Sequence, residues 1–160
     1  MTQPLDGIRV LELAEGTAGP MAAWFLAEIG ADVCKLEPPR GDRDRPRPNF
    51  HLLNRGKRSL VLDPHAPADR PRLNALLRGA DALILDETTR RAWDLDIAAL
   101  DRAHPNLVVV HAPLYGSAGP YAALPEDDDL LGVASIGDLI KSTIEEQQFT
   151  VAQMEQYIHS

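Results

Sequence analysis

Disulfide bonds and membrane spans are the first features that this chain of 160 residues lacks. A single cysteine, Cys34, excludes an intrachain disulfide framework and is typical of proteins in a reducing compartment. No apolar run approaches the roughly 20 residues that cross a bilayer, and no basic segment followed by an apolar run marks a secretory signal. We therefore expect a soluble, cytoplasmic protein without a membrane partner.

Several catalytic and binding patterns are missing as well. The five histidines never occur as H-x-H or H-x-x-x-H, so we expect no metal site. A G-x-S-x-G nucleophile elbow is absent. Aromatic residues make up 5% of the chain and do not alternate with its arginines, and the formal net charge is -8. Together these two features disfavour nucleic acid as a partner.

The negative charge is concentrated at the C-terminal end. Residues 1–125 contain 15 Lys and Arg against 16 Asp and Glu, a balance of -1, whereas residues 126–160 contain one Lys against eight Asp and Glu, a balance of -7. All 13 prolines also precede residue 126. Such a change in composition indicates two differently built segments, and we predict one unit over residues 1–125 and a second over 126–160.

Hydrophobic patterning predicts strands and helices that alternate along the first segment. Short apolar runs predict strands over residues 8–13, 33–36, 58–62, 82–85 and 107–110. Helical spacing predicts helices over residues 20–29, 69–78 and 97–103, and the prolines of residues 38–57 predict a loop. The alternation predicts a Rossmann-like, doubly wound α/β fold with a mostly parallel sheet. A strand over 130–135 and helices over 139–148 and 151–158 predict a C-terminal helical tail.

The strongest candidate for a binding site is the strand–turn–helix–strand unit of residues 8–36. Its turn, Gly16 to Pro20, leads into a helix whose first N–H groups suit a phosphate. The following segment, residues 35–58, holds eight Lys and Arg against three Asp and Glu, a balance of +5. Arginine forks match phosphate oxygens, so this segment favours a phosphate-bearing ligand over a purely solvated loop. The turn is not G-x-G-x-x-G, and we interpret Glu37 as a residue that structures the loop.

A series of short motifs resembles the family III CoA-transferases, whose members share them in the same order. They are PLDGIRVLEL (4–13), AGP (18–20), LAEIGADV (26–33), KLEPPRGD (35–42), NRGKRS (54–59), AD (80–81), HPNLV (104–108) and YGSAGPY (115–121). The resemblance implies a Rossmann-like CoA-binding half, an interlaced homodimer, and transfer of CoA between an acyl-CoA thioester and a carboxylate. It therefore implies CoA or acyl-CoA as the small-molecule partner.

The same resemblance implies which residues contact CoA. The turn before the AGP helix corresponds to Thr17 and Ala18, and the basic loop after the second strand points to Arg40. Lys57 and Arg58 match the family's K-R-S motif, which serves either phosphate binding or packing.

Two departures from the family pattern bear on activity. This chain has Asp86 and Glu87 where members usually have an Asn-Phe pair near the pantetheine, and two carboxylates would repel a phosphate or thiolate. The family's catalytic aspartate lies in a Gly-Asp turn well beyond the Y-G-x-x-G-P loop and attacks the thioester. Asp138 follows a glycine but stands too soon after that loop, so the catalytic residue is unknown and the transferase half is expected to be incomplete.

Residues 130–160 resemble a different family, the closing segment of a CBS-domain protein. The resemblance rests on the segment LGVASIGDLIK (131–141) and on the later E-Q-Q-F-T…Y-I-H run. The resemblance implies that Ser135 and Asp138 hold a nucleotide phosphate and ribose, although this segment covers about half of one CBS motif.

Three hypotheses follow from these patterns. The first is a CoA-binding part of a family III CoA-transferase, weakly active or inactive alone. The second is a non-catalytic module, CBS-like, that senses adenine nucleotides or mediates oligomerisation. The third, an intact enzyme that uses Asp138, ranks last because of the spacing.

Overall fold

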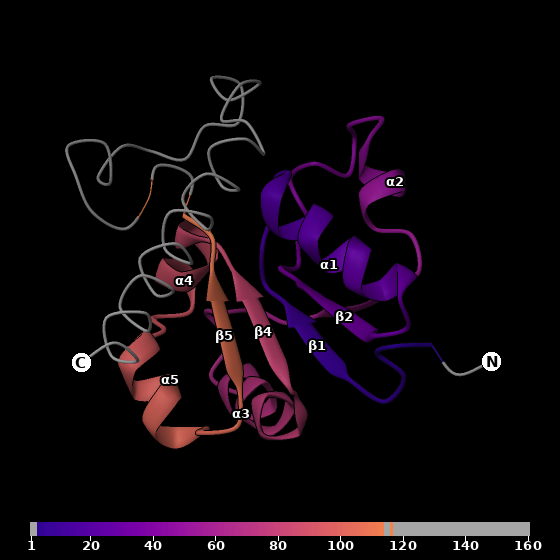
Figure 1. The fold of residues 1–160 in the computed structure, drawn as a ribbon. Coiled ribbons are helices and arrows are strands. Elements are labelled where there is room, and N and C mark those ends of the chain that lie inside the picture. The colour runs from indigo at the N-terminus through magenta and orange to yellow at the C-terminus, as the bar shows by residue number, and fades with distance from the viewer. Residues whose placement is uncertain (1–2, 114–115, 117–160) are drawn as a thin grey trace, which may run out of the picture. The chain divides into compact units, whose positions relative to one another are not determined.

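Five short apolar segments form one parallel β-sheet in the computed structural model, which describes residues 3–113 and residue 116 (Figure 1). The strands are β1 (Arg9–Glu12), β2 (Asp32–Glu37), β3 (Arg58–Val61), β4 (Ala82–Leu85) and β5 (Val108–His111). Their order in the sheet is β3-β2-β1-β4-β5, and every neighbouring pair is parallel. The predicted α/β fold with a parallel sheet is confirmed, and each predicted strand agrees with the observed one to within two residues at either end.

Helices connect the strands, and two of them differ from the sequence prediction. The helices are α1 (Ala18–Glu28), α2 (Phe50–Leu53), α3 (Asp69–Gly79), α4 (Glu87–Ala92) and α5 (Ile97–Ala103). The short helix α2 lies within the predicted loop 38–57, and α4 had no predicted counterpart. Helix α4 forms because the Asp86 side chain accepts a hydrogen bond from the Thr89 N–H at 2.7 Å, which caps its first turn.

The sheet is covered on both faces, as a doubly wound fold requires. On one face, Val10, Val33 and Ile84 pack with Ala23 of α1. On the other, leucines of β1 and β4 pack with Leu73 of α3, and this core extends to α5. Because side chains alternate along a strand, the two groups point to opposite faces, and Figure 1 shows α1 and α3 on different sides of the strands.

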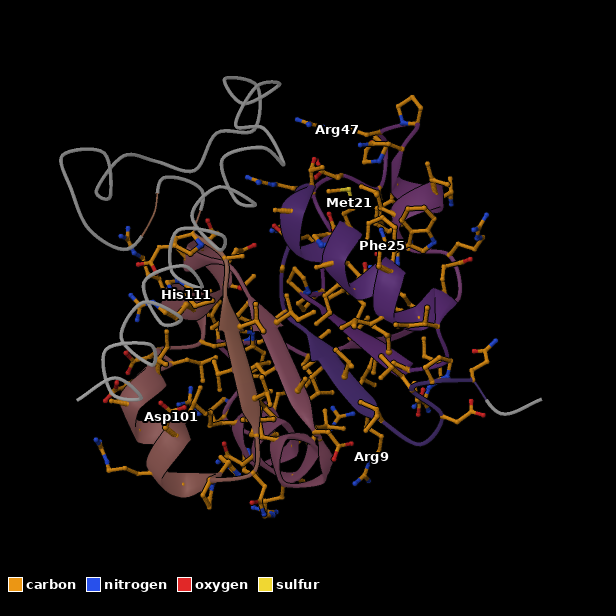
Figure 2. All side chains as sticks on the ribbon, viewed as in Figure 1. Arg9, Met21, Phe25, Arg47, Asp101 and His111 are labelled. Atoms are coloured by element: carbon orange, nitrogen blue, oxygen red, sulfur yellow. The ribbon has the colours of Figure 1, made fainter. Side chains whose placement is uncertain are left out.

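Helix α1 contacts the sheet largely through small residues, although Met21, Trp24, Phe25 and Ile29 recur along it at helical spacing. Its buried residues are Gly19, Pro20 and Ala23. Phe25 is 56% exposed and Ile29 44% exposed, and Phe25 points outward from α1 (Figure 2). The small residues Gly19 and Ala23 let the helix backbone approach the strands closely, and Leu26 packs against the same core.

The strand order places a topological switch point between β1 and β4. The chain winds from β1 outward through β2 to β3, then returns past β1 to β4 and continues to β5. In open parallel sheets, ligands bind where the loops after two such strands diverge. The loops after β1 and β4 are therefore the place to look for a site.

The described residues belong to one compact unit, Met1–Glu126. The predicted strand over 130–135, the helices over 139–148 and 151–158, and the CBS-like residues Ser135 and Asp138 lie outside the described residues. Within the described part of the chain, no helix is long and apolar enough to span a bilayer.

Candidate functional site

The loops after β1 and β4 are joined directly at the switch point. The backbone N–H of Glu15, in the loop after β1, donates to Oδ2 of Asp86 at 2.7 Å. Asp86 is the first residue after β4, and its Oδ1 accepts from the Thr89 N–H. One carboxylate therefore ties the β1 loop to the start of α4 and fixes the two sides of the crevice relative to each other.

The turn into α1 is shaped by two glycines. Gly16 has a φ of 77°, a conformation that residues with a side chain rarely adopt. Gly19 lies so close to Ala14 that a Cβ atom added to it would stand 2.2 Å from the Ala14 Cβ. Thr17 and Ala18, between them, are exposed, and Thr17 makes no side-chain capping hydrogen bond. The first turn of α1 therefore offers a ligand at most the N–H groups of Ala18 and Gly19, because Pro20 has no N–H and the Met21 N–H donates to the Thr17 carbonyl at 2.9 Å.

Arg40 approaches this turn from the loop after β2. Its Nη2 donates to both carboxylate oxygens of Glu15 at 2.8 Å, and its Nη1 donates to the Gly41 carbonyl at 3.0 Å. Nε of Arg43 lies 4.0 Å from the same carboxylate. The Arg40 side chain remains 56% exposed, whereas that of Glu15 is 6% exposed. The structure thus gathers three of the predicted site residues, Thr17, Ala18 and Arg40, around Glu15.

Lys57, a fourth predicted site residue, lies in a buried ionic network beneath that loop. Its Nζ donates to Glu12 Oε2 at 2.6 Å, to the Pro20 carbonyl at 2.8 Å and to Asn54 Oδ1 at 3.1 Å. These three acceptors use all three N–H donors of the ammonium, and the side chain is 2% exposed. In the structure, Lys57 connects β1 to the first turn of α1.

Lys35 occupies the centre of the same network. Its Nζ lies 2.8 Å from both Glu12 Oε1 and Asp42 Oδ2 and donates to the Ala14 carbonyl at 2.7 Å. Burial lowers the pKa of Lys35, but the nearby carboxylates Glu12 and Asp42 outweigh it and raise the pKa above its usual value. For Lys57, burial prevails over the attraction of Glu12, and its pKa is lowered. Two carboxylates lie within 2.8 Å of the Lys35 ammonium, whereas Lys57 pairs directly with Glu12 alone, and the charge of Lys35 further lowers the pKa of Lys57.

Arg58, the fifth predicted site residue, points elsewhere. It begins β3, and its Nε donates to Asp32 Oδ1 at 2.9 Å, at the start of β2. This pair is exposed and belongs to the end of the sheet where the strands start, opposite the loops that hold Arg40. Arg58 also contributes, with Lys57, to a pocket of about 170 Å³ between β2, β3 and α2.

Glu37 structures the loop after β2, as its position predicted. Its carboxylate accepts hydrogen bonds from Arg45 at 2.7 and 2.8 Å, from the Ser59 hydroxyl at 2.6 Å and from the Asp42 N–H at 3.0 Å. Burial raises the pKa of Glu37, but these hydrogen bonds, led by that of Arg45, lower it overall. The loop that carries Arg40 is therefore anchored at both its start and its middle.

Glu87 does not stand as an unpaired carboxylate near the site. Its oxygens accept from Arg90 at 2.6 and 2.7 Å and from Arg91 at 2.6 Å, and Nε2 of His111 lies 3.1 Å away. The hydrogen bond from Arg90, then that from Arg91, outweigh burial and lower the pKa of Glu87 to about 2. Figure 2 shows His111 at the end of β5 beside α4. The spacing of Glu87 from Arg90 and Arg91, three and four residues, was a signal for this pairing that the sequence reading did not use.

Glu15 is the residue of this site that sequence reasoning missed. It stands one residue before the glycine turn and carries no motif of its own, so only the folded loop shows its contact with Arg40.

Within the described ranges, 3–113 and 116, no group of acidic, histidine or cysteine side chains is arranged to hold a metal ion.

Comparison with known proteins identifies a family for this chain. The model of the family described as "CoA-transferase family III" matches residues 5–154. The chain is 37% identical over 139 residues to the succinate–glutarate CoA-transferase of Agrobacterium fabrum, which covers 74% of this chain and 34% of the relative. It is 32% identical over 148 residues to the succinyl-CoA–D-citramalate CoA-transferase of Chloroflexus aurantiacus, covering 85% of this chain and 35% of the relative.

A solved structure shares the fold. The crystal structure of a CAIB/BAIF family protein from Brucella suis superposes with a TM-score of 0.73 at 33% identity, over 81% of this chain and 38% of that one. The chain thus spans about a third of the length of the curated relatives that it matches.

Proposed function

The chain belongs to CoA-transferase family III, and from that membership we propose that its described part binds the CoA portion of an acyl-CoA thioester. In a complete active unit, this part serves transfer of CoA between a thioester and a carboxylate. The observation that carries the proposal is the contact of Arg40 with Glu15 at the switch point, two residues before the exposed Thr17 at the start of α1. Helix N–H groups and an arginine fork both suit the phosphates of CoA.

Thr17 and Ala18 contact the ligand through the turn, and Arg40 contacts a phosphate. Lys57 contributes by holding Glu12 and the Pro20 carbonyl, which fixes the start of α1. A direct contact between Arg58 and CoA remains a prediction.

Isothermal titration with CoA tests the proposal. We expect Arg40→Gln to weaken CoA binding by about tenfold or more, since a charge-assisted hydrogen bond contributes about 1.5–3 kcal/mol. Arg55→Gln is a matched control, because Arg55 is equally exposed at 58% and also pairs with a carboxylate, that of Glu28. Equal CoA affinity of the two variants would contradict the proposal. Unchanged affinity in Arg58→Gln would remove Arg58 from the site.

Transferase activity of the chain by itself is expected to be weak or absent, because no residue matches the family's catalytic aspartate. An assay with several acyl-CoA donors and carboxylate acceptors tests this, and trapping of an acyl anhydride at Asp138 with hydroxylamine would contradict it. A homodimer is part of the same proposal, and light scattering after size-exclusion chromatography tests it.

The CBS-like alternative concerns residues 126–160, outside the described residues. The family III model extends to residue 154 and so covers most of that segment, which favours the CoA-transferase interpretation. Titration with AMP and ATP separates the two, because nucleotide binding that is lost in Asp138→Ala would support the alternative.

A further inference from the structure

The carboxylate of Glu15 accepts hydrogen bonds from Arg40, the residue that is proposed to contact a ligand phosphate. The Glu15 side chain is 6% exposed, and its own backbone N–H is held by Asp86 at 2.7 Å. Its two oxygens both lie 2.8 Å from Nη2 of Arg40, and Nε of Arg43 lies 4.0 Å away. The chain therefore supplies an anion of its own between the guanidinium groups of the loop after β2.

Carboxylate and phosphate oxygens use the same donors of a guanidinium. A phosphate that approaches Arg40 from the exposed side has to share or replace the contact with Glu15. The Arg40 side chain is half-exposed, so solvent and salt screen its attraction to Glu15. A phosphate or diphosphate carries more charge than one carboxylate and makes the exchange favourable, whereas a ligand that carries only a carboxylate gains nothing from it.

Resting on the proposed function, we propose that Glu15 is a specificity determinant that competes with the ligand phosphate for Arg40. It lowers the affinity of the site for every anion and leaves measurable binding only to phosphate-bearing ligands. It also keeps the Arg40 side chain in position between binding events. Glu15 acts through Arg40, so it is a positioning residue and takes no part in bond making.

The test compares Glu15→Gln with the unmodified chain by isothermal titration with CoA and with inorganic pyrophosphate. We expect the variant to bind both about fivefold more tightly at low ionic strength, because the competing charge is gone, and we expect the gain to shrink as salt is added. Glu28→Gln is the matched control: Glu28 also accepts from an arginine, Arg55, at 2.9 Å, but at the far end of α1. The control should leave both affinities unchanged.

Each outcome decides between the two proposals. If the unmodified chain binds CoA and Glu15→Gln binds it equally or more weakly, the role of Glu15 is wrong and the proposed function stands. If only the variant binds, competition by Glu15 is supported. If neither binds CoA or pyrophosphate, both proposals fail. Thermal unfolding of each variant, with Glu15→Ala as a second substitution, shows whether a change in affinity comes from a folded protein.

Discussion

The Nζ atom of Lys35 lies 2.8 Å from Oε1 of Glu12, and the two side chains are 3% and 0% exposed. This pair joins β1 to β2 directly beneath the loops of the candidate site. Glu12 also accepts from Lys57, so one buried carboxylate holds two cations that lie 23 and 45 residues away along the chain.

Substitution of Lys35 by Met should destabilise the protein strongly. It leaves Asp42 without its buried cation and Glu12 with one cation in place of two, and breaking a buried pair costs about 3–5 kcal/mol. Arg58→Met removes the exposed pair with Asp32 and should change the free energy of unfolding by about 0–1 kcal/mol. Urea denaturation measures both values, and equal values would show that the Lys35 network does not stabilise the fold.

Gly19→Ala should destabilise the protein and displace the turn before α1. The new Cβ would lie 2.2 Å from that of Ala14, and overpacking of this kind costs about 1–3 kcal/mol. Gly79→Ala, at the last residue of α3, is the comparison. The new Cβ would first meet the flexible end of the Arg9 side chain, at 3.4 Å. This substitution should leave the stability unchanged or increase it by up to about 1 kcal/mol. A loss of stability in both variants would mean that close approach to Ala14 is not the cause.

Glu87 should contribute to the acid sensitivity of the fold. Its pKa is lowered to about 2 in the folded protein from an ordinary value of 4.5. Ionised Glu87 therefore stabilises the fold fully at a pH above its ordinary pKa of 4.5. This stabilisation is lost as the pH falls through about 2, because the unfolded chain takes up the proton first. Since Glu87 lies near the surface, we expect about 1 kcal/mol. Glu87→Gln should flatten the decline in unfolding free energy between about pH 5 and pH 2.

The control for this measurement is Asp101→Asn, which removes an exposed carboxylate from α5 (Figure 2). It should leave the slope of unfolding free energy against pH nearly as it is. A slope that is the same in the unmodified chain and in Glu87→Gln would contradict the assigned role of Glu87.

Cys34 should react slowly with thiol reagents in the folded protein. Burial, the largest effect, raises the pKa of its thiol above the ordinary value of 9.0, and the thiolate is the reactive form. We expect labelling by Ellman's reagent at neutral pH to be at least about tenfold slower than in urea. Because Cys34 is the only cysteine, the absorbance reports this site alone. Equal rates in the two conditions would show that the β2 strand opens readily.

Much of the fold was predictable because apolar runs and breaker residues lie close together in the sequence. The strand over 82–85 and the helix over 97–103 match the observed elements at both ends. Helices α2 and α4 were not predicted, since elements of four and six residues depend on a cap or a packing contact more than on periodicity. The exposure of Phe25 could not be predicted, because apolar spacing does not tell which face of a helix meets the sheet.

The sequence by itself determined the alternation of strands and helices, the parallel sheet, and the motifs that point to CoA. Through the family resemblance it also predicted CoA contacts at Thr17, Ala18 and Arg40, and in the structure Arg40 pairs with Glu15, close in the chain to the first two. Only the tertiary structure decided which charges are already paired: Arg40 with Glu15, Lys57 with Glu12, and Arg58 with Asp32. The physical reason is that an ion pair depends on strand register and loop packing between residues far apart in the chain, and the charge of a residue type does not specify either.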